Sequence, residues 1–359
     1  MAPIRIALIG LSANAKTSWA AESHLPYLLS PRGRQHYTIT ALLNSSTGAA
    51  EAARAHYGLP GDVKVYGNPE ALARDPDVEL VVCNTRVDTH FDVAAPSARA
   101  GKAVYVEWPP TRDLESSEEL ASLAAKTSGG ASIVGLQGRV ARVVLKVREV
   151  VDSGRVGKVL GSDVEAYGNL LPRDELPGGW RGTAFESRLQ IQRPEVKILG
   201  AGLELRRVRT DVPDLIALHG AIRGRNTVDG ATLAVRFRNG PPFKGRPAFV
   251  WRIVGEKGEV EIESPSGPYL HSDSYDEPIV IRAHEHGSDE VADISWGWET
   301  WQEELPVRAR NVGEVYERFA RWVELGRGEV EGGGRWPTLQ DAVLRMRELD
   351  TLFQHFDKQ

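Results

Sequence analysis

Short apolar runs alternate with helix-like stretches along the first third of the chain. The runs Ile6–Ile9, Tyr37–Leu43, Asp77–Thr85 and Ala103–Val106 are brief, and their apolar residues include many β-branched ones. Such runs are typical of strands that are buried on both faces of a parallel sheet. The alternation of strands and helices continues to about residue 136. The pattern therefore predicts an α/β fold with a doubly wound parallel sheet.

The first predicted strand runs into a glycine turn. Gly10 ends the strand, small residues follow it, and Lys16–Leu29 carries the apolar positions of a helix. A helix N-terminus behind a glycine turn favours diphosphate binding, because its backbone N–H groups are unpaired and carry partial positive charge. The alternative is an ordinary βα turn, since Ser12 replaces the second glycine of the dinucleotide fingerprint. The candidate cofactor contacts of this Rossmann-type turn are Gly10, Ser12, Ala13, Asn14, Lys16 and Trp19.

The second predicted strand ends in Asn44, Ser45 and Ser46. In a dinucleotide-binding fold, an acidic residue at this strand end binds the ribose 2′-hydroxyl and selects NAD. No acidic residue is present here, and the three polar side chains can donate hydrogen bonds to a 2′-phosphate. Because no Arg or Lys accompanies them, NADP is only mildly favoured over NAD. The alternative is that these residues merely cap the next helix.

Two later strand ends carry further polar residues. Asn84, Thr85 and Arg86 follow one strand, with His90 at the start of the next helix, and Glu107 and Trp108 follow another. The carboxyl ends of parallel strands meet at one edge of the sheet, where ligands of doubly wound folds bind. We therefore expect these residues to line the same cofactor site.

These segments carry a family resemblance. The strand–Gly10–helix unit, the segment from Asn84 to His90 and Glu107-Trp108-Pro109 resemble the glucose-fructose oxidoreductase / inositol dehydrogenase / MocA (Gfo/Idh/MocA) superfamily. Val106-Glu107-Trp108 and Gly135-Leu136-Gln137-Gly138-Arg139 resemble its fungal branch, which includes the galactose regulon repressor Gal80. The resemblance implies an NAD(P)-binding domain over residues 1–136 and an α+β substrate and dimerisation domain over 137–359, with a large open, mostly antiparallel sheet. It also adds Gln137 to the cofactor contacts.

The chain departs from the superfamily pattern at two places. Trp108 stands where most of these enzymes have a lysine that assists proton and hydride transfer, and an indole cannot act as an acid or base near neutral pH. The helix that usually carries a Gly-His-x-x-Asp pattern is also absent, as though removed between Phe185 and Glu186. Either the protein is a natural short variant, or one exon was left out when this sequence was deduced from its gene.

The catalytic residue is therefore unknown from the sequence. Glu107 is assigned to holding the cofactor or the adjacent backbone. His24 and His90 are possible substitutes for the missing proton donors, but their positions on predicted helices favour structural or cofactor-proximal roles. The sequence thus predicts a chain that binds NADP or NAD and turns over slowly or not at all.

Composition narrows the classes of protein to consider. With 359 residues, the chain exceeds the size of most single domains. Its formal net charge of −5 gives no general attraction for nucleic acid or anionic membranes, and no apolar run has the length of a membrane span. The single cysteine, Cys83, excludes an internal disulfide and fits a reducing compartment. We therefore expect an intracellular protein without a signal peptide, membrane contact or direct nucleic acid contact.

Two other groups of residues invite functional interpretations. His284-Glu285-His286 could suggest a metal site, but no further ligand stands at a defined spacing, so no metal is predicted. Trp296, Trp298 and Trp301 could form a partner-binding surface, although local core packing is the favoured interpretation.

Two functional hypotheses remain, together with the possibility of a non-functional product of a truncated gene. The first is a cytoplasmic NAD(P)-dependent oxidoreductase, homodimeric through its C-terminal sheet, that acts on a small hydroxyl or carbonyl compound such as a sugar, polyol or secondary metabolite. The second is a Gal80-like regulator with access to the nucleus. It would keep the nucleotide site as a sensor and bind a transcription factor through its second domain.

Overall fold

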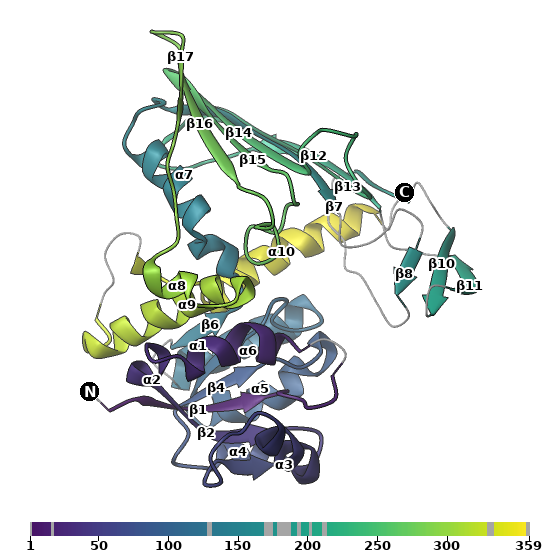
Figure 1. Cartoon of the computed structure of the whole chain (residues 1–359), viewed down its shortest axis with the longest axis vertical. Coiled ribbons are helices and arrows are strands. Elements are labelled where there is room, and N and C mark those ends of the chain that lie inside the picture. The colour runs from purple at the N-terminus through teal and green to yellow at the C-terminus, as the bar shows by residue number, and fades with distance from the viewer. Residues whose placement is uncertain are drawn as a thin grey trace. The chain divides into compact units, whose positions relative to one another are not determined.

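The computed structural model describes residues 2–15, 18–127, 131–168, 175–177, 188–191, 195–200, 203–209, 214–328 and 334–356 (Figure 1). The chain divides into two compact units. The first unit comprises Met1–Ala141 and Trp298–Arg347, and the second comprises Arg142–Gly297 and Glu348–Gln359. The domain boundary after residue 136 stays a prediction. The two units differ from the predicted domains chiefly because the segment Trp298–Arg347 belongs to the first unit.

A parallel sheet forms the centre of the first unit. Its described strands follow the order β3-β2-β1-β4-β5-β6, and every neighbouring pair is parallel. The chain therefore winds outward from β1 on one side and from β4 on the other, so the strand order reverses between β1 and β4. Ligands of doubly wound sheets bind at this reversal. The strands are β1 (Ile4–Ile9), β2 (Tyr37–Leu43), β3 (Lys64–Tyr66), β4 (Leu80–Cys83), β5 (Ala103–Val106) and β6 (Ser132–Val134).

Both faces of this sheet are covered. Successive side chains of a strand point to opposite faces, and Ile6 and Leu8 of β1 enter one apolar cluster while Ala7 and Ile9 enter another. Burial on both faces explains why the strands read as continuous apolar runs. The helical segments of this unit are η1 (Ala20–His24), α1 (Leu25–Leu29), α2 (Gly33–His36), α3 (Thr47–His56), α4 (Pro69–Ala73), η2 (Val87–Thr89), α5 (His90–Arg99), α6 (Leu114–Thr127), η3 (Gln137–Val140), α8 (Thr300–Glu303) and α9 (Val307–Glu324).

The first helix differs from its prediction. The sequence places its start near Lys16, but the helix begins with a π turn, η1, whose last hydrogen bond runs from the Leu25 N–H to the Ala20 carbonyl. Ser18 precedes this turn and accepts a hydrogen bond from the Ala21 N–H on its Oγ at 3.3 Å. Lys16 itself lies outside the described residues. The predicted helix start was therefore several residues too early, because apolar spacing does not reveal a change of helical pitch.

The second unit is built on a large open sheet. Its described strands follow the order β17-β16-β15-β14-β7-β13-β12-β9, and all neighbours are antiparallel except β7 and β13. Strands β14 and β15 form an antiparallel pair joined by a short turn. A smaller sheet has the order β11-β10-β8. These observations confirm the predicted fold class.

The bounds of the second unit's elements are α7 (Arg142–Asp152), β7 (Val159–Gly168), β8 (Glu175–Pro177), β9 (Arg188–Gln190), β10 (Glu195–Gly200), β11 (Leu203–Arg209), β12 (Leu215–Ala221), β13 (Thr227–Asn239), β14 (Phe249–Gly255), β15 (Gly258–Ser264), β16 (Val280–Glu285) and β17 (Glu290–Asp293). Helix α10 (Leu339–Phe356) begins in the first unit and ends in the second. The predicted gap between Phe185 and Glu186 lies outside the described residues. Among the helices described, none is both long enough and apolar enough to cross a membrane.

The three tryptophans near residue 300 make local contacts. Trp301 packs against the core of the first unit, with its ring 5.9 Å from that of Tyr27 in an edge-on arrangement. The Arg310 guanidinium lies 5.1 Å from the ring centre of Trp298. Trp296, in the second unit, donates its indole N–H to the Ile279 carbonyl at 2.8 Å. Each ring thus takes part in packing within its own unit, as the favoured interpretation expects.

Candidate functional site

The carboxyl ends of five strands bring the predicted strand-end residues into one row. Backbone hydrogen bonds continue the sheet by one residue on each strand, from Gly10 N to Leu43 O, from Asn84 N to Ile9 O and from Glu107 N to Cys83 O. Asn44 extends β2 in the same way, and Gly135 extends β6 with a 2.9 Å bond to Val106 O. Parallel pairing thus places residues that are far apart in the chain along a single edge, which spans the strand-order reversal.

Gly10 occupies a position that only glycine tolerates. Its φ is +88°, and a Cβ built on it would lie 2.9 Å from the Asn84 carbonyl oxygen and 3.0 Å from Thr85 Cγ2. The steric demand at Gly10 therefore comes from the neighbouring strand end. A larger residue here would disturb the fold as well as any ligand, so a Gly10 substitution cannot by itself test cofactor binding.

The loop after Gly10 is held in place by side chains that directly follow β2 and α3. Asn44 donates its amide to the Leu11 carbonyl at 2.8 Å, and Tyr57 donates its hydroxyl to the Ser12 carbonyl at 2.9 Å. Within the loop, Ser12 Oγ accepts from the Asn14 N–H at 3.2 Å. Leu11 is fully buried. The loop is therefore anchored at Leu11 and Ser12, and the internal bond from Asn14 to Ser12 spans Ala13.

The amide of Asn44 has a different role from the one expected. Besides Leu11, its Nδ2 approaches the Ala49 carbonyl at 3.3 Å, so the donors that were to bind a 2′-phosphate are already engaged. What Asn44 offers a ligand is its acceptor oxygen. Ser46 caps α3 by accepting from the Ala49 N–H at 3.1 Å, which agrees with the capping alternative and leaves its hydroxyl proton for donation. Ser45 is exposed beside it.

Buried amide atoms of two side chains at this edge lack partners in the described part of the chain. Within the described residues, neither Nδ2 nor Oδ1 of Asn84 has a hydrogen-bond partner, and the same holds for Oε1 of Gln137. Buried polar atoms without a partner are costly and uncommon in native proteins, so they point to a bound group that completes them. A nicotinamide dinucleotide fits this donor and acceptor set, because its phosphates and ribose hydroxyls accept or donate and its carboxamide does both. The residues present thus suit the cofactor that the fold implies.

The remaining candidates near β4 serve the local structure. Thr85 Oγ1 accepts from Thr89 Oγ1 at 2.9 Å, and both ring nitrogens of the buried His90 face backbone carbonyls, those of Thr85 and Pro109, at 2.9 Å each. The Arg86 side chain is 79% exposed and forms a two-pronged pair with Asp88. His90 therefore ties the end of β4 to the segment after β5, and the Arg86 guanidinium is held outward.

Glu107 forms the most distinctive contact at the edge. One carboxylate oxygen, Oε1, lies 2.9 Å from Nε2 of His24, and His24 Nδ1 lies 2.8 Å from the hydroxyl of Tyr316. His24 and Tyr316 are fully buried, whereas the Glu107 side chain is 13% exposed. These three residues, here called the Glu107–His24–Tyr316 chain, connect the edge of the site to the core through hydrogen bonds.

The proton positions in this chain follow from its partners. Burial, followed by the fields of Tyr37 and Glu107, raises the pKa of Tyr316 well above that of free tyrosine, so Tyr316 keeps its hydroxyl proton. A carboxylate can only accept hydrogen bonds, so the His24 Nε2–H donates to Glu107 Oε1. Tyr105, whose ring lies 5.0 Å from that of His24, also has its pKa raised by burial and by Glu107. Glu107 is thus held by an imidazole whose ring is oriented by its contact with Tyr316.

Gly135 makes room for the Glu107 carboxylate. A Cβ at Gly135 would lie 2.2 Å from Glu107 Oε2 and 2.6 Å from its Cδ. The absence of a side chain at the end of β6 is therefore a condition for the carboxylate position, and Gly135 acts as a positioning residue.

Trp108 takes the place of the expected lysine as a packing residue. It is partly buried against an apolar cluster that includes Val106 of β5 and Leu136, which follows β6. Trp19 is likewise partly buried, against the core on the other face of the sheet. Neither position offers an acid or base at the edge.

Sequence reasoning missed the connection between Glu107, His24 and Tyr316, although it considered His24 and Glu107 separately. It also missed Tyr57 and the steric role of Gly135. The only available signal was a histidine on the first helix, because the pairing depends on a π turn and on a helix from the end of the chain.

Comparison with known proteins supports this picture. Residues 4–135 match the oxidoreductase family with an NAD-binding Rossmann fold, GFO_IDH_MocA. Dehydrogenase aclE of Aspergillus oryzae is 28% identical over 385 residues, covering 98% of this chain and 95% of that protein. The galactose/lactose metabolism regulatory protein GAL80 of Saccharomyces cerevisiae is 27% identical over 187 residues, covering 50% of this chain but only 39% of the regulator.

Solved structures share the fold of the described residues. A super-repressor mutant of Gal80p from Saccharomyces cerevisiae has a TM-score of 0.82 at 20% identity, covering 99% of this chain and 96% of that one. An NAD-binding oxidoreductase from Klebsiella pneumoniae has a TM-score of 0.76 at 16% identity, covering 99% and 98%. At these identities the likeness concerns architecture, and both a regulator and an enzyme share it.

Proposed function

Because the chain belongs to the Gfo/Idh/MocA superfamily, in its Gal80-like branch, we propose that it is an NAD(P)-dependent oxidoreductase. Its substrate is a small hydroxyl or carbonyl compound, such as a sugar, a polyol or a secondary metabolite. The observation that carries the proposal is the partly exposed Glu107 carboxylate, held by His24 on the edge that bears the Asn84 amide and Gln137 Oε1, for which the described residues offer no hydrogen-bond partner.

The chemistry divides between the cofactor and the chain. When bound, the nicotinamide supplies or accepts the hydride. In the oxidative direction, a Glu107 oxygen accepts the proton of the substrate hydroxyl while the carbon–hydrogen bond breaks; in the reductive direction, protonated Glu107 returns that proton to the new alkoxide. The His24 Nε2–H stays directed at Glu107 Oε1 and fixes the orientation of the carboxylate. A carboxylate in this position replaces the missing lysine as proton acceptor.

Turnover measurements test the proposal. The sequence alone predicts slow or absent turnover, because the lysine and the histidine that the superfamily resemblance implies as proton donors are absent. The Glu107–His24 pair instead predicts measurable oxidation or reduction. The chain is assayed with a panel of sugars and polyols, with NADP and NAD, beside a version in which the missing helix is restored from a related sequence. Activity of the chain as it stands supports Glu107 as the proton acceptor. Activity of the restored version alone assigns that role to the missing segment.

The alternative function is a Gal80-like regulator that binds the cofactor without catalysis. The regulatory relatives of the sequence and their shared fold favour it as the second candidate. In that case NADP or NAD binds normally, neither version turns over any substrate, and a transcription factor binds the second unit. Cofactor-dependent capture of an activator peptide without turnover would support this alternative over the enzyme.

Cofactor choice provides a separate prediction. We expect NADP to bind at least as well as NAD, through the Ser45 and Ser46 hydroxyls. Ser45→Asp places a negative charge beside the ribose without disturbing the Asn44 amide, and it is expected to weaken NADP binding by about tenfold or more, as for loss of a charge-assisted contact. Calorimetry with NADP and NAD measures the change.

The matched control for this test is Ser45→Asn, which adds similar volume without charge. NADP affinity should stay near that of the parent in this variant. Equal NADP affinities of the Asp and Asn variants would show that Ser45 lies away from the 2′-phosphate and would withdraw the assignment.

We also propose how the protein assembles and where in the cell it is found. The open sheet of the second unit is the surface through which we expect homodimerisation, and the cytoplasm is the expected compartment, with nuclear access if the protein is regulatory. No contact with nucleic acid or membrane is part of the proposal.

A further inference from the structure

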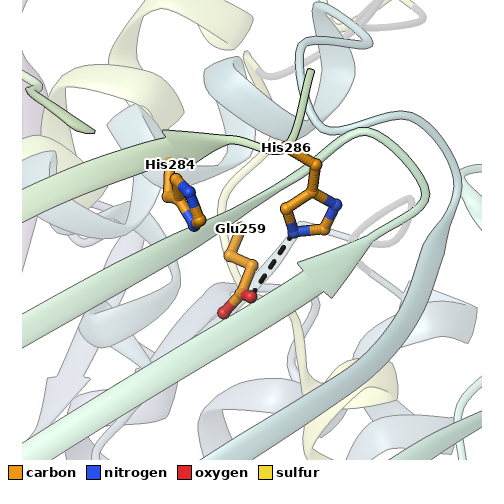
Figure 2. A group of neighbouring side chains, drawn as sticks. All are labelled: Glu259, His284 and His286. Atoms are coloured by element: carbon orange, nitrogen blue, oxygen red, sulfur yellow. Dashed lines mark hydrogen bonds and ion pairs between the residues drawn. The ribbon is translucent and has the colours of Figure 1, made fainter. Parts of the chain in front are cut away.

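Three metal-ligating side chains meet on the large sheet of the second unit. Glu259 lies on β15, His284 lies on β16, and His286 follows β16 directly. One ligand atom from each of them lies within 4.8 Å of the others. Figure 2 shows the three side chains gathered on one face of the sheet, with the His286 ring turned toward the Glu259 carboxylate. This Glu259–His284–His286 cluster is separate from the edge of the parallel sheet.

The register of the sheet fixes the cluster. Glu259 and His284 are direct partners across the antiparallel β15–β16 pair, and His286 stands two residues beyond His284, so it faces the same side. On the opposite side, Val260 and Ala283 are buried in the core, at 0% and 1% exposure. A slip of one residue would exchange these faces, so core packing holds the three ligands together. The sequence alone showed only the two histidines, because the carboxylate comes from the preceding strand.

A fourth side chain supports one of the histidines. His284 Nε2 lies 2.9 Å from Asp289 Oδ1, in the turn between β16 and β17. A histidine that binds a metal through one ring nitrogen usually gives its other N–H to a carboxylate, which fixes the ring and raises its basicity. With Nε2 facing Asp289, His284 keeps Nδ1 for a metal. The pair reproduces the outer support of a metal-binding imidazole.

The neighbouring guanidinium on β16 pairs with carboxylates other than Glu259. Arg282, two residues before His284, contacts Glu263 at 3.0 Å and Glu261 at 3.8 Å. The ion pair that the described residues show for Glu259 is with His286, at 3.4 Å. In the described part of the chain, the ion-pair contact of Glu259 is thus with a histidine and not with an Arg or Lys, so its carboxylate remains a candidate metal ligand.

We propose that Glu259, His284 and His286 bind one divalent transition-metal ion of the zinc class. Two imidazoles and one carboxylate form a ligand set that suits zinc and leaves a position for water, whereas Mg²⁺ and Ca²⁺ prefer oxygen ligands throughout. Ligand atoms about 2.0–2.1 Å from zinc lie about 3.3 Å from one another, so the side chains close around the ion by small rotations. The ion links β15 to β16 and the turn that follows, and it stabilises the folded edge of the sheet by mass action.

Binding of Zn²⁺ alone to the untagged full chain tests the proposal, after treatment with a chelator. Calorimetry at neutral pH is expected to show one equivalent bound. His284→Ala, His286→Ala and Glu259→Gln should each weaken Zn²⁺ binding at least tenfold, and Asp289→Ala should weaken it by about tenfold, as loss of an outer partner does. The positions are on the surface, and circular dichroism of each variant verifies that it remains folded.

The matched control is His219→Ala, which removes an exposed histidine from β12 of the same sheet and should leave Zn²⁺ binding unchanged. X-ray absorption of the zinc complex should show two imidazoles with oxygen ligands, and affinity should fall on acidification because both rings must be neutral. Zn²⁺ binding that survives in the His284→Ala/His286→Ala double variant overturns the proposal. So does equal binding of Mg²⁺, which would indicate a non-specific acidic surface, or an absence of Zn²⁺ binding.

Discussion

Replacing Glu107 by Gln is expected to lower the turnover number by about a hundred- to ten-thousandfold, the usual contribution of a positioned proton acceptor. Glutamine keeps the shape of the side chain and can still contact His24 Nε2, but it cannot accept the substrate proton. Steady-state kinetics with the substrate found in the panel measures the effect.

Two comparisons separate proton transfer from cofactor binding and from general damage. Calorimetry of Glu107→Gln with NADP should show a much smaller change in affinity than in turnover. Glu79→Gln removes an exposed carboxylate that pairs with Arg5 just before β4, at the opposite end of that strand, and should leave turnover unchanged. If Glu107→Gln retains parental turnover, Glu107 has only the cofactor-holding role that the sequence assigns to it.

Gly135→Ala is expected to lower the free energy of unfolding by about 1–3 kcal/mol, because the new methyl group displaces the Glu107 carboxylate and leaves buried His24 without its partner. Turnover should fall together with stability, although the substitution removes no polar group. Urea unfolding and steady-state kinetics measure the two effects. In a Glu107→Ala background, where the methyl group has room, Gly135→Ala should lower the free energy of unfolding only slightly.

The four proteins of this double-mutant cycle isolate the contact between residues 107 and 135. Gly48→Ala serves as the matched glycine control, since a Cβ at Gly48 of α3 meets no atom within 4 Å and alanine favours helix. Its stability should be equal to or above that of the parent. If Gly135→Ala lowers the free energy of unfolding equally in both backgrounds, the strain does not come from the Glu107 side chain. Gly135 would then have no role in positioning Glu107.

Most of the first unit was accessible from the sequence because its strands are buried on both faces. Tyr37–Leu43 and Ala103–Val106 were predicted with the bounds that the structure shows. The short strands β3 and β17 were not predicted as such, because three or four residues carry too little periodicity. The residues at the carboxyl edge were identified by their positions after strands, which is a property of chain order alone.

The chemistry at the edge of the sheet was harder to predict from the sequence, because it depends on which polar atoms already form hydrogen bonds within the protein. Asn44 appeared to be a donor for a ligand, but the structure commits its amide to Leu11 and Ala49. Glu107 and His24 were judged separately because no spacing rule relates a strand end to an earlier helix. Their partner Tyr316 enters from α9, late in the chain. Only the packed fold reveals such contacts.

The π turn at Ala20–His24 sets the rotational phase of the first helix. A π turn contains one residue more than an α turn, and one residue corresponds to about 100° around the helix axis. Because the wider turn absorbs this extra residue, the residues on either side of it keep nearly the phase of a regular helix. A related chain with one residue fewer between Ser18 and His24 would therefore form a regular α turn and still present its imidazole to Glu107, whereas loss of a second residue would rotate the imidazole by about 100° and leave the carboxylate unpartnered. The contact between His24 and Glu107 is thus expected to tolerate a change of one residue in the length of this segment, but not of two.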